Sequence, residues 1–146
     1  MKHILLTGAT GMIGSAIVRE SLRRDCQVTC IVRKDSSRVK NIPNDSRIHV
    51  VECDISDYGS LELSGKYDVF MHLAWDKTSV GGRDDVDCQL RNIQYTLDAV
   101  RLAKRAGCSV FIGAGSQAEY GVKSEPLTCD MPVNPESGYG IAKFLL

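Results

Sequence analysis

A tyrosine and a lysine near the end of the chain have the types and the spacing of an acid–base pair. Residues 138–143 read GYGIAK, so that Tyr139 and Lys143 lie four positions apart. On a helix, residues i and i+4 lie on one face, one turn apart. The ammonium of the lysine then stabilises the phenolate of the tyrosine, and the phenol can exchange a proton with a substrate hydroxyl. The alternative is an ordinary pair on a helix surface, because the Y-x-x-x-K spacing also arises by chance.

Three glycines near the start have the spacing of a phosphate-binding loop. Residues 5–18 read LLTGATGMIGSAIV, with Gly8, Gly11 and Gly14 at every third position. A tight turn after a strand, the approach of a diphosphate and the packing of a helix on that strand each favour a residue without a side chain. The helix N-terminus would supply N–H groups and a partial positive charge to the anion. The alternative is a glycine-containing loop without a ligand.

The segments around these motifs alternate between strands and helices. Apolar runs predict five strands, over residues 3–8, 27–33, 47–53, 67–74 and 109–115. Helical patterns predict helices over residues 12–24, 57–64 and 84–106 and from Ser137 onward, with a loop over 116–136. Such alternation predicts an α/β fold with a doubly wound parallel sheet. The three glycines then lie between the first strand and the first helix, where a dinucleotide-binding loop is expected.

Two of the expected helices carry an apolar stripe. In the helix over 12–24 the stripe consists of Ile13, Ala16, Ile17 and Leu22. In the helix over 84–106 it consists of Val86, Leu90, Ile93, Leu97, Val100 and Leu102.

Four segments together resemble the short-chain dehydrogenase/reductase superfamily. The glycine loop has the pattern T-G-x-x-G-x-x-G, and HLA at 72–74, NIQYT at 92–96 and the Y-x-x-x-K motif follow in order. The chain is most similar to the extended branch of this superfamily, the NAD(P)-dependent epimerase/dehydratase family that acts on nucleotide sugars. The resemblance covers nearly all of the chain and implies a Rossmann-type fold. It also implies a nicotinamide cofactor and hydride transfer to or from a sugar.

The resemblance also implies where the cofactor binds. The expected cofactor-binding residues are Gly8, Thr10, Gly11, Met12, Ile13, Gly14, Arg33, Lys34, Asp54, Ile55, Leu73, Ala74, Asn92, Tyr139 and Lys143. The Asp54 carboxylate would accept a hydrogen bond from the adenine amino group, although an aspartate after a strand is often only a helix cap. Asn92 and Thr96 match a helix motif that supports the active-site loops. His72 is expected to be structural.

The end of the second expected strand favours NADP over NAD. An acidic residue about 20 positions after the glycines normally binds the ribose hydroxyls of NAD. Val32 stands at that position here, and the cations Arg33 and Lys34 follow it. These two cations suit a 2′-phosphate. The alternative is a solvated pair of surface charges, and the nearby Asp35 keeps NAD possible.

Ser116 completes the catalytic set that the resemblance implies. The segment FIGAGSQAEYG resembles the family's S-x-x-x-Y-G motif, whose serine holds the substrate oxygen and orients it towards Tyr139. In the family's 4,6-dehydratases the next two residues are acid–base residues, whereas this chain has Gln117 and Ala118. On an extended segment Glu119 would point elsewhere. The resemblance therefore implies a 4-keto-sugar reductase or a 4-epimerase, and NADP would favour the reductase.

The chain is about half as long as is usual for the family. The resemblance stops shortly after Lys143, so we expect residues 1–146 to be an incomplete Rossmann domain without the substrate-binding domain. Such a chain is expected to bind the dinucleotide but to have little or no activity on a nucleotide sugar. An exposed apolar patch is expected at its end, at Ile141, Phe144, Leu145 and Leu146. By resemblance, a homodimer would form through helices 84–106 and 137–146. The alternative function is a non-catalytic dinucleotide-binding module or an inactive fragment.

Composition argues against several other classes of protein. The formal net charge is zero, which gives no electrostatic case for nucleic acid or an anionic membrane, and no apolar run approaches the length of a membrane span. The three histidines are scattered and no Cys/His cluster has the spacing of metal ligands. Six cysteines occur without a C-x-x-C pair, which indicates free thiols in a reducing cytoplasm: Cys26, Cys30, Cys53, Cys88, Cys108 and Cys129.

Overall fold

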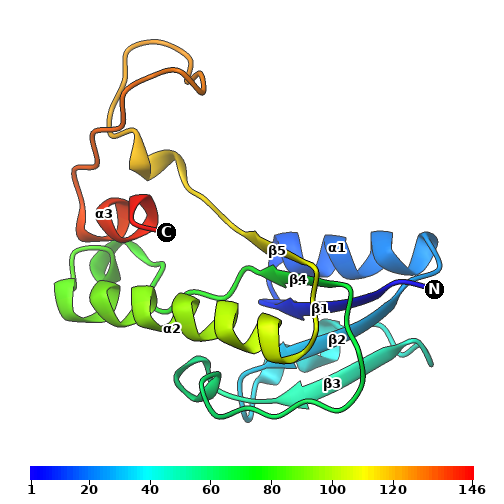
Figure 1. The fold of residues 1–146 in the computed structure, drawn as a ribbon. Coiled ribbons are helices and arrows are strands. Elements are labelled where there is room, and N and C mark those ends of the chain that lie inside the picture. Colours follow the sequence, from blue (N-terminus) through cyan, green and yellow to red (C-terminus); the bar gives the residue numbers. More distant parts are fainter. The chain divides into compact units, whose positions relative to one another are not determined.

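The computed structural model describes residues 1–146, apart from the side chain of Val80. The strands are β1 (His3–Thr7), β2 (Gln27–Val32), β3 (Ile48–Glu52), β4 (Val69–His72) and β5 (Val110–Gly113). The α-helices are α1 (Met12–Arg23), α2 (Val86–Arg105) and α3 (Gly138–Phe144) (Figure 1). Four short 3₁₀ helices are η1 (Ser37–Asn41), η2 (Ile55–Asp57), η3 (Val80–Gly82) and η4 (Gln117–Glu119).

The chain forms two compact units. The first comprises Met1–Ala74 and Asp98–Gly113, and therefore holds the whole sheet, α1 and the last turns of α2. The second comprises Trp75–Leu97 and Ala114–Leu146, and holds the earlier turns of α2, η4 and α3.

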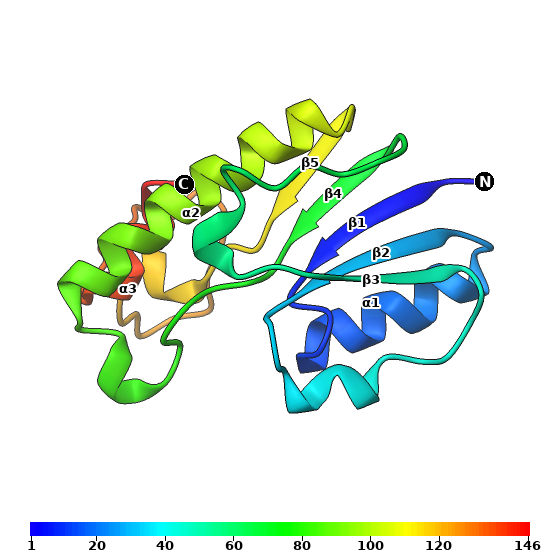
Figure 2. The same ribbon diagram turned by 90° about the horizontal axis from the view of Figure 1, so that it is seen from below.

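The sheet of the first unit is parallel and doubly wound, as the sequence predicts. Its strand order is β3-β2-β1-β4-β5, and every neighbouring pair is parallel (Figure 2). Helix α1 covers one face, where Val18 packs against the side chains of Ile4, Leu6, Val28 and Cys30. The last turns of α2 cover the other face. There Ala99, Leu102 and Ala103 belong to one buried cluster with Leu5, Ile31 and Phe70.

The buried face of α1 differs from the expected stripe. Gly14, Val18 and Ser21 are buried, whereas Ile13 and Ala16 are exposed and Ile17 and Leu22 are half-buried. Gly14 sets this orientation, because a Cβ there would overlap the carbonyl oxygen of Gly8 and only a bare backbone fits. Residues 14, 18 and 21 then share the face that meets β1.

The apolar stripe of α2 also faces outward over most of its length. Val86, Leu90, Leu97 and Val100 are 41–60% exposed, and we call these four residues the outer stripe. Leu102 is buried and Ile93 half-buried. The inward side chains are instead small or polar and include Cys88, Gln89, Asn92, Thr96 and Ala99. An apolar stripe normally marks the buried face of a helix, whereas the outer stripe is exposed.

The expected helix over 57–64 is absent from the described backbone. The 3₁₀ helix Ile55–Asp57 is followed by turns and irregular chain. The guanidinium of Arg105 donates hydrogen bonds to the carbonyl oxygens of Tyr58 (2.9 Å) and Leu61 (3.3 Å). A side chain from α2 therefore satisfies carbonyl groups that a helix would have paired internally.

Helix α3 begins where the sequence predicts. Ser137 is its N-cap, and its hydroxyl accepts a hydrogen bond from the backbone N–H of Gly140 at 3.0 Å. A Cβ at Gly140 would overlap the carbonyl oxygen of Ala118, so α3 packs closely against η4. The apolar side chains at the end of the chain are exposed as expected: Ile141, Phe144, Leu145 and Leu146.

All six cysteines carry free thiols, and Cys30, Cys53 and Cys88 are buried. Among the described residues, no helix is both long and apolar enough to span a membrane. No group of three or more potential metal ligands occurs in the part of the chain that the structure describes.

Candidate functional site

The backbone of the glycine loop requires glycine at positions 8 and 14. Gly8 has φ +73°, in the left-handed region, and a Cβ there would lie 3.0 Å from Leu73. The N–H of Gly11 donates to the carbonyl oxygen of Gly8 at 3.1 Å, which closes the turn. Gly14 lets the first turn of α1 approach that same carbonyl. The three glycines therefore form one tight turn between β1 and α1.

The N-terminus of α1 is arranged for an anion. Gly11 is its N-cap and, among the described groups, no side chain caps the first turn and no acidic residue lies in it. The first N–H groups of a helix lack intrahelical partners and carry the positive end of its dipole. Met12 and Ile13, on this first turn, are 87% and 62% exposed. A phosphate at this place would receive N–H donors and meet no repelling carboxylate.

A buried polar contact holds the end of β4 beside the loop. Thr7 Oγ1 lies 2.9 Å from His72 Nδ1 and accepts hydrogen bonds from the N–H groups of Leu73 and Ala74, both at 3.1 Å. His72 is 3% exposed, which agrees with the expected structural role. Leu73 and Ala74 thereby lie against Gly8, on the edge of the sheet where the glycine loop begins.

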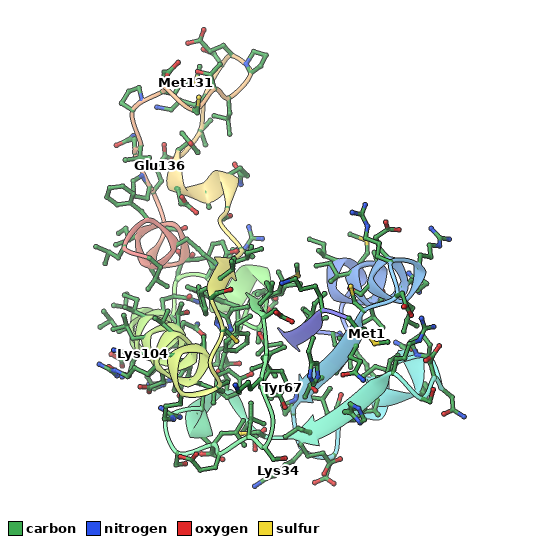
Figure 3. All side chains as sticks on the ribbon, turned by 45° about the vertical axis from the view of Figure 1, so that its right-hand side comes forward. Met1, Lys34, Tyr67, Lys104, Met131 and Glu136 are labelled. Atoms are coloured by element: carbon green, nitrogen blue, oxygen red, sulfur yellow. The ribbon has the colours of Figure 1, made fainter. Side chains whose placement is uncertain are left out.

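Two cations follow β2 on the same edge. Val32 is buried, and Arg33 and Lys34 after it are exposed (Figure 3 labels Lys34). β1 and β2 are parallel and pair Thr7 with Ile31, so both strands end at the carboxyl edge of the sheet. This is the edge at which ligands of open α/β sheets bind.

Asp54 and Ile55 follow β3 at that edge and are half-buried. Asp54 is the N-cap of η2, but its side chain makes no capping hydrogen bond. The alternative of a capping carboxylate is therefore not observed among the described residues, and contact with adenine stays a prediction.

In the second unit, Lys143 lies in a semi-enclosed polar–aromatic site. Its Nζ donates a hydrogen bond to the carbonyl oxygen of Ala114 at 2.7 Å and lies 3.6 Å from the centroid of the Trp75 ring. Burial lowers the pKa of Lys143 to about 8, while the negative charge of Glu119 acts in the opposite direction. The ammonium is thus poised to titrate close to physiological pH.

Tyr139 shares this environment through two residues that sequence reasoning missed. Its ring meets Trp75 in a T-shaped arrangement, with centroids 5.7 Å apart and an interplanar angle of 83°. The Arg83 guanidinium lies 5.3 Å from the Tyr139 ring centroid, and the N–H of Tyr139 donates to the Arg83 carbonyl at 2.8 Å. The only signal in the sequence was that Trp75 directly follows the HLA segment, which does not reveal these contacts.

Ser116 caps η4. Its Oγ accepts from the N–H of Ala118 at 3.2 Å, and Glu119 Oε1 accepts from the N–H of Ser116 at 2.6 Å, which completes a capping box. The segment is helical and not extended, so the alternation argument for Glu119 was wrong. The Glu119 carboxylate nevertheless already has a partner, because it accepts the hydrogen bond from the Ser116 backbone N–H. Because Ser116 Oγ serves as an acceptor here, its own proton can be donated to another oxygen.

Asn92 clamps the loop that follows Trp75. Its Oδ1 accepts from the N–H of Asp76 at 2.9 Å and its Nδ2 donates to the Asp76 carbonyl at 3.0 Å. Thr96 Oγ1 in turn donates to the Asn92 carbonyl at 3.0 Å. These contacts fit the expected support of a loop, whereas direct contact of Asn92 with a cofactor stays a prediction.

A cavity of about 470 Å³ in the second unit lies beside η4 and the start of α3. Its lining includes Arg83, Gln117, Ala118 and Ser137, which adjoin Ser116 and Tyr139 in the chain or in space. Lys123 adds a second cation to its wall. The wall also contains the carboxylates of Asp84, Glu125 and Glu136, so this cavity beside the Ser116 and Tyr139 segments is a candidate site for a polar, hydroxyl-bearing substrate.

Several known proteins are similar to this chain. The model of the NAD dependent epimerase/dehydratase family matches residues 4–146. A dTDP-6-deoxy-L-talose 4-dehydrogenase (NAD(+)) of Aggregatibacter actinomycetemcomitans is 26% identical over 144 residues, which cover 99% of this chain and 52% of that protein. A UDP-glucose 4-epimerase of Mycolicibacterium smegmatis is 31% identical over 147 positions, which cover 95% of this chain and 47% of that protein.

Among solved structures, UDP-glucuronic acid 4-epimerase from Bacillus cereus in complex with NAD is similar to this chain with a TM-score of 0.77 and 26% identity. That match covers 97% of this chain and 49% of the epimerase. The chain therefore spans about half the length of the relatives that it matches.

Proposed function

The chain belongs to the NAD dependent epimerase/dehydratase family, and from that premise we propose that it is the dinucleotide-binding part of an enzyme that moves a hydride to or from a nucleotide-activated sugar. The observation that carries the proposal is the partly buried Lys143 ammonium, one helical turn from Tyr139 and beside the Ser116 segment. A binding module that only senses a dinucleotide has no need of these three side chains, which favours an enzyme.

The residues of the first unit fit a nicotinamide dinucleotide. The glycine turn and the uncapped first turn of α1 suit its diphosphate, because Gly14 lets the first turn of α1 approach the Gly8 carbonyl and no side chain caps that turn. Asp54 and Ile55 would contact adenine, and Leu73 and Ala74 would lie along the cofactor. When bound, the nicotinamide would accept or supply the hydride.

We propose NADP as the preferred cofactor, with NAD as the second candidate. Arg33 and Lys34 are exposed after β2, where an acidic residue would favour NAD. The relatives named above point to NAD, since one is named as NAD(+)-dependent and another was solved with NAD. Asp35 lies close enough in sequence to bind the ribose hydroxyls of NAD. Arg33 would contact the 2′-phosphate of NADP and would have no such partner in NAD.

The proposed chemistry uses the second unit. Tyr139 would give a proton to, or take one from, the sugar C4 oxygen as the hydride moves, and Ser116 would donate a hydrogen bond to that oxygen. Lys143 would hold the cofactor ribose and stabilise the Tyr139 phenolate. Gln117 and Ala118 cannot shuttle the protons of water elimination, which supports a 4-keto-sugar reductase or a 4-epimerase over a 4,6-dehydratase.

We further propose that residues 1–146 form a cofactor-binding domain. The outer stripe of α2 and the exposed end of α3 are proposed to pair with a second copy. A cytoplasmic location is proposed because all six cysteines are free thiols.

A calorimetric titration of the chain with NADPH and with NADH tests the cofactor proposal. We expect NADPH to bind more tightly. Arg33→Ala should weaken NADPH binding by about tenfold, the order of magnitude of one lost charge-assisted hydrogen bond, and should leave NADH unchanged. Arg23→Ala removes an equivalent guanidinium from the far end of α1 and should change neither affinity.

Two outcomes would overturn parts of this proposal. Tighter NADH binding that Arg33→Ala leaves unaltered would reject NADP and retain NAD. Failure of both dinucleotides to bind would reject the dinucleotide-binding function of the glycine loop.

A further inference from the structure

Trp75 contacts both members of the proposed acid–base pair. Its ring lies 3.6 Å from Lys143 Nζ and meets the Tyr139 ring at 83°, with centroids 5.7 Å apart. All three residues belong to the second unit. We propose that Trp75 is a positioning residue. Its indole face binds the Lys143 ammonium, and the edge-to-face contact of its ring orients Tyr139. The role of Trp75 in catalysis rests on the proposed function, whereas its contacts with Lys143 and Tyr139 do not depend on that function.

The indole is itself held by a buried amide. Trp75 Nε1 donates to Gln89 Oε1 at 2.9 Å, and Gln89 is 1% exposed on α2. Gln89 Nε2 donates to the Gly82 carbonyl at 2.7 Å. An indole N–H can only donate and a carbonyl can only accept, so these two partners fix which end of the amide faces Trp75.

This anchoring gives the indole one orientation beneath Lys143. An aromatic face carries negative electrostatic potential, so it favours a cation placed over it. The Ala114 carbonyl supports the ammonium by a hydrogen bond. Burial has the opposite effect to these two contacts, because it disfavours the charged ammonium and lowers the pKa of Lys143. The indole therefore keeps Lys143 charged at a pH where its burial alone would favour the neutral amine.

The charged and titratable groups around Lys143 are few. Glu119 on η4 favours the ammonium from a distance, and Tyr139 lies on the same helix as Lys143. The Arg83 guanidinium faces the Tyr139 ring. Variants that change Trp75 or Gln89 keep all of these charged and titratable groups in the sequence, so that a shift in the titration of Lys143 can be assigned to the loss or release of the indole.

Trp75 is the only tryptophan of the chain, so its fluorescence reports on this contact without cofactor or substrate. We expect the emission of the full chain to change with pH in one step near pH 8, as the cation on the indole face is lost. Lys143→Met should abolish this step. Lys104→Met, at an exposed lysine on α2, should leave it unchanged. Gln89→Leu, which frees the indole, should reduce its amplitude and shift its midpoint to lower pH.

A second measurement keeps the proposal testable when the indole itself is changed. The pKa of Lys143 can be followed by NMR of the lysine side chain in Trp75→Leu and Trp75→Phe. Loss of the aromatic face in Trp75→Leu should lower this pKa by about half a unit, and Trp75→Phe should lower it less. Circular dichroism would check that each variant is folded.

The outcomes separate this inference from the proposed function. An emission titration identical in the native chain and Lys143→Met would overturn the positioning role, and so would an unchanged Lys143 pKa in folded Trp75→Leu. NADPH binding could still be intact in that case. If the shifts appear but no dinucleotide binds, the contact is real and the proposed function fails.

Discussion

Ser116 serves the fold and the proposed chemistry with one hydroxyl. Its Oγ accepts the N–H of Ala118, which orders the start of η4, while its proton stays available for a substrate oxygen. Lys143 shows the same double use, because its ammonium holds the Ala114 carbonyl and stands one turn from Tyr139. At this scale the site is pre-organised by contacts to the backbone on either side of Ser116.

The lowered pKa of Lys143 predicts a pH-dependent stability. Burial brings this pKa from 10.5 to about 8, so between these values the unfolded chain binds more protons than the folded chain. The contribution of Lys143 to the free energy of unfolding therefore rises as the pH increases from about 8 towards 10.5. Below pH 8 its charge is buried at a cost, and above that pH the neutral amine relieves the cost.

Urea unfolding of the native chain and Lys143→Met, at pH 7 and pH 9.5, measures this effect. The native chain should gain stability relative to the variant at the higher pH, and the comparison cancels the titration of other groups. Lys104→Met, at an exposed position, should show no such gain. A difference that stays constant from pH 7 to pH 9.5 would contradict the lowered pKa.

At the scale of elements, Gly14 determines how α1 sits on the sheet. We expect Gly14→Ala to destabilise the chain by about 1–3 kcal/mol, because its Cβ would overlap the Gly8 carbonyl and approach Ala9 Cα at 2.8 Å. Gly11→Ala is a matched comparison, since its Cβ would meet only the Gly8 carbonyl, at 3.4 Å. Thermal and urea unfolding would measure both, and equal stabilities would show that α1 can shift freely.

The strands and the glycine turn could be predicted from the sequence because they depend on local pattern. Buried parallel strands are continuous apolar runs, and a turn with φ +73° at Gly8 requires glycine. Ser137 likewise predicts the start of α3, because its hydroxyl can cap the helix. Each of these features depends on a few neighbouring residues, so the sequence alone was enough to predict it.

The faces of the helices could not be predicted in the same way. Polar residues such as Gln89 and Asn92 are buried because the loop before α2 folds back on them and supplies their partners, Gly82 and Asp76. The irregular chain after η2 depends on Arg105, which lies far along the sequence. Trp75 in the candidate site was missed because its partners come from two other elements, Gln89 on α2 and Tyr139 and Lys143 on α3.

At the scale of the whole molecule, the outer stripe predicts self-association. Leu90 is 57% exposed at its centre, and a row of apolar side chains on a helix is a common interface between copies. Sedimentation should give a mass of about twice 16.0 kDa for the native chain. Leu90→Glu should give the mass of the single chain, because it would place charges in the interface.

Val50→Glu is the control for this experiment, because Val50 is also exposed but lies on β3. It should leave the mass unchanged. A native chain that sediments as a single copy at every concentration tested would reject the proposed homodimer.

The proposed function requires a dinucleotide to bind at the glycine loop. Hydrogen–deuterium exchange with and without saturating NADPH tests this most directly, because the first N–H groups of α1 have no intrahelical partners and exchange fast until a phosphate accepts them. We expect slower exchange in residues 11–15 when NADPH is bound. Unchanged exchange at residues 11–15, with NADPH in excess, would contradict the proposed function.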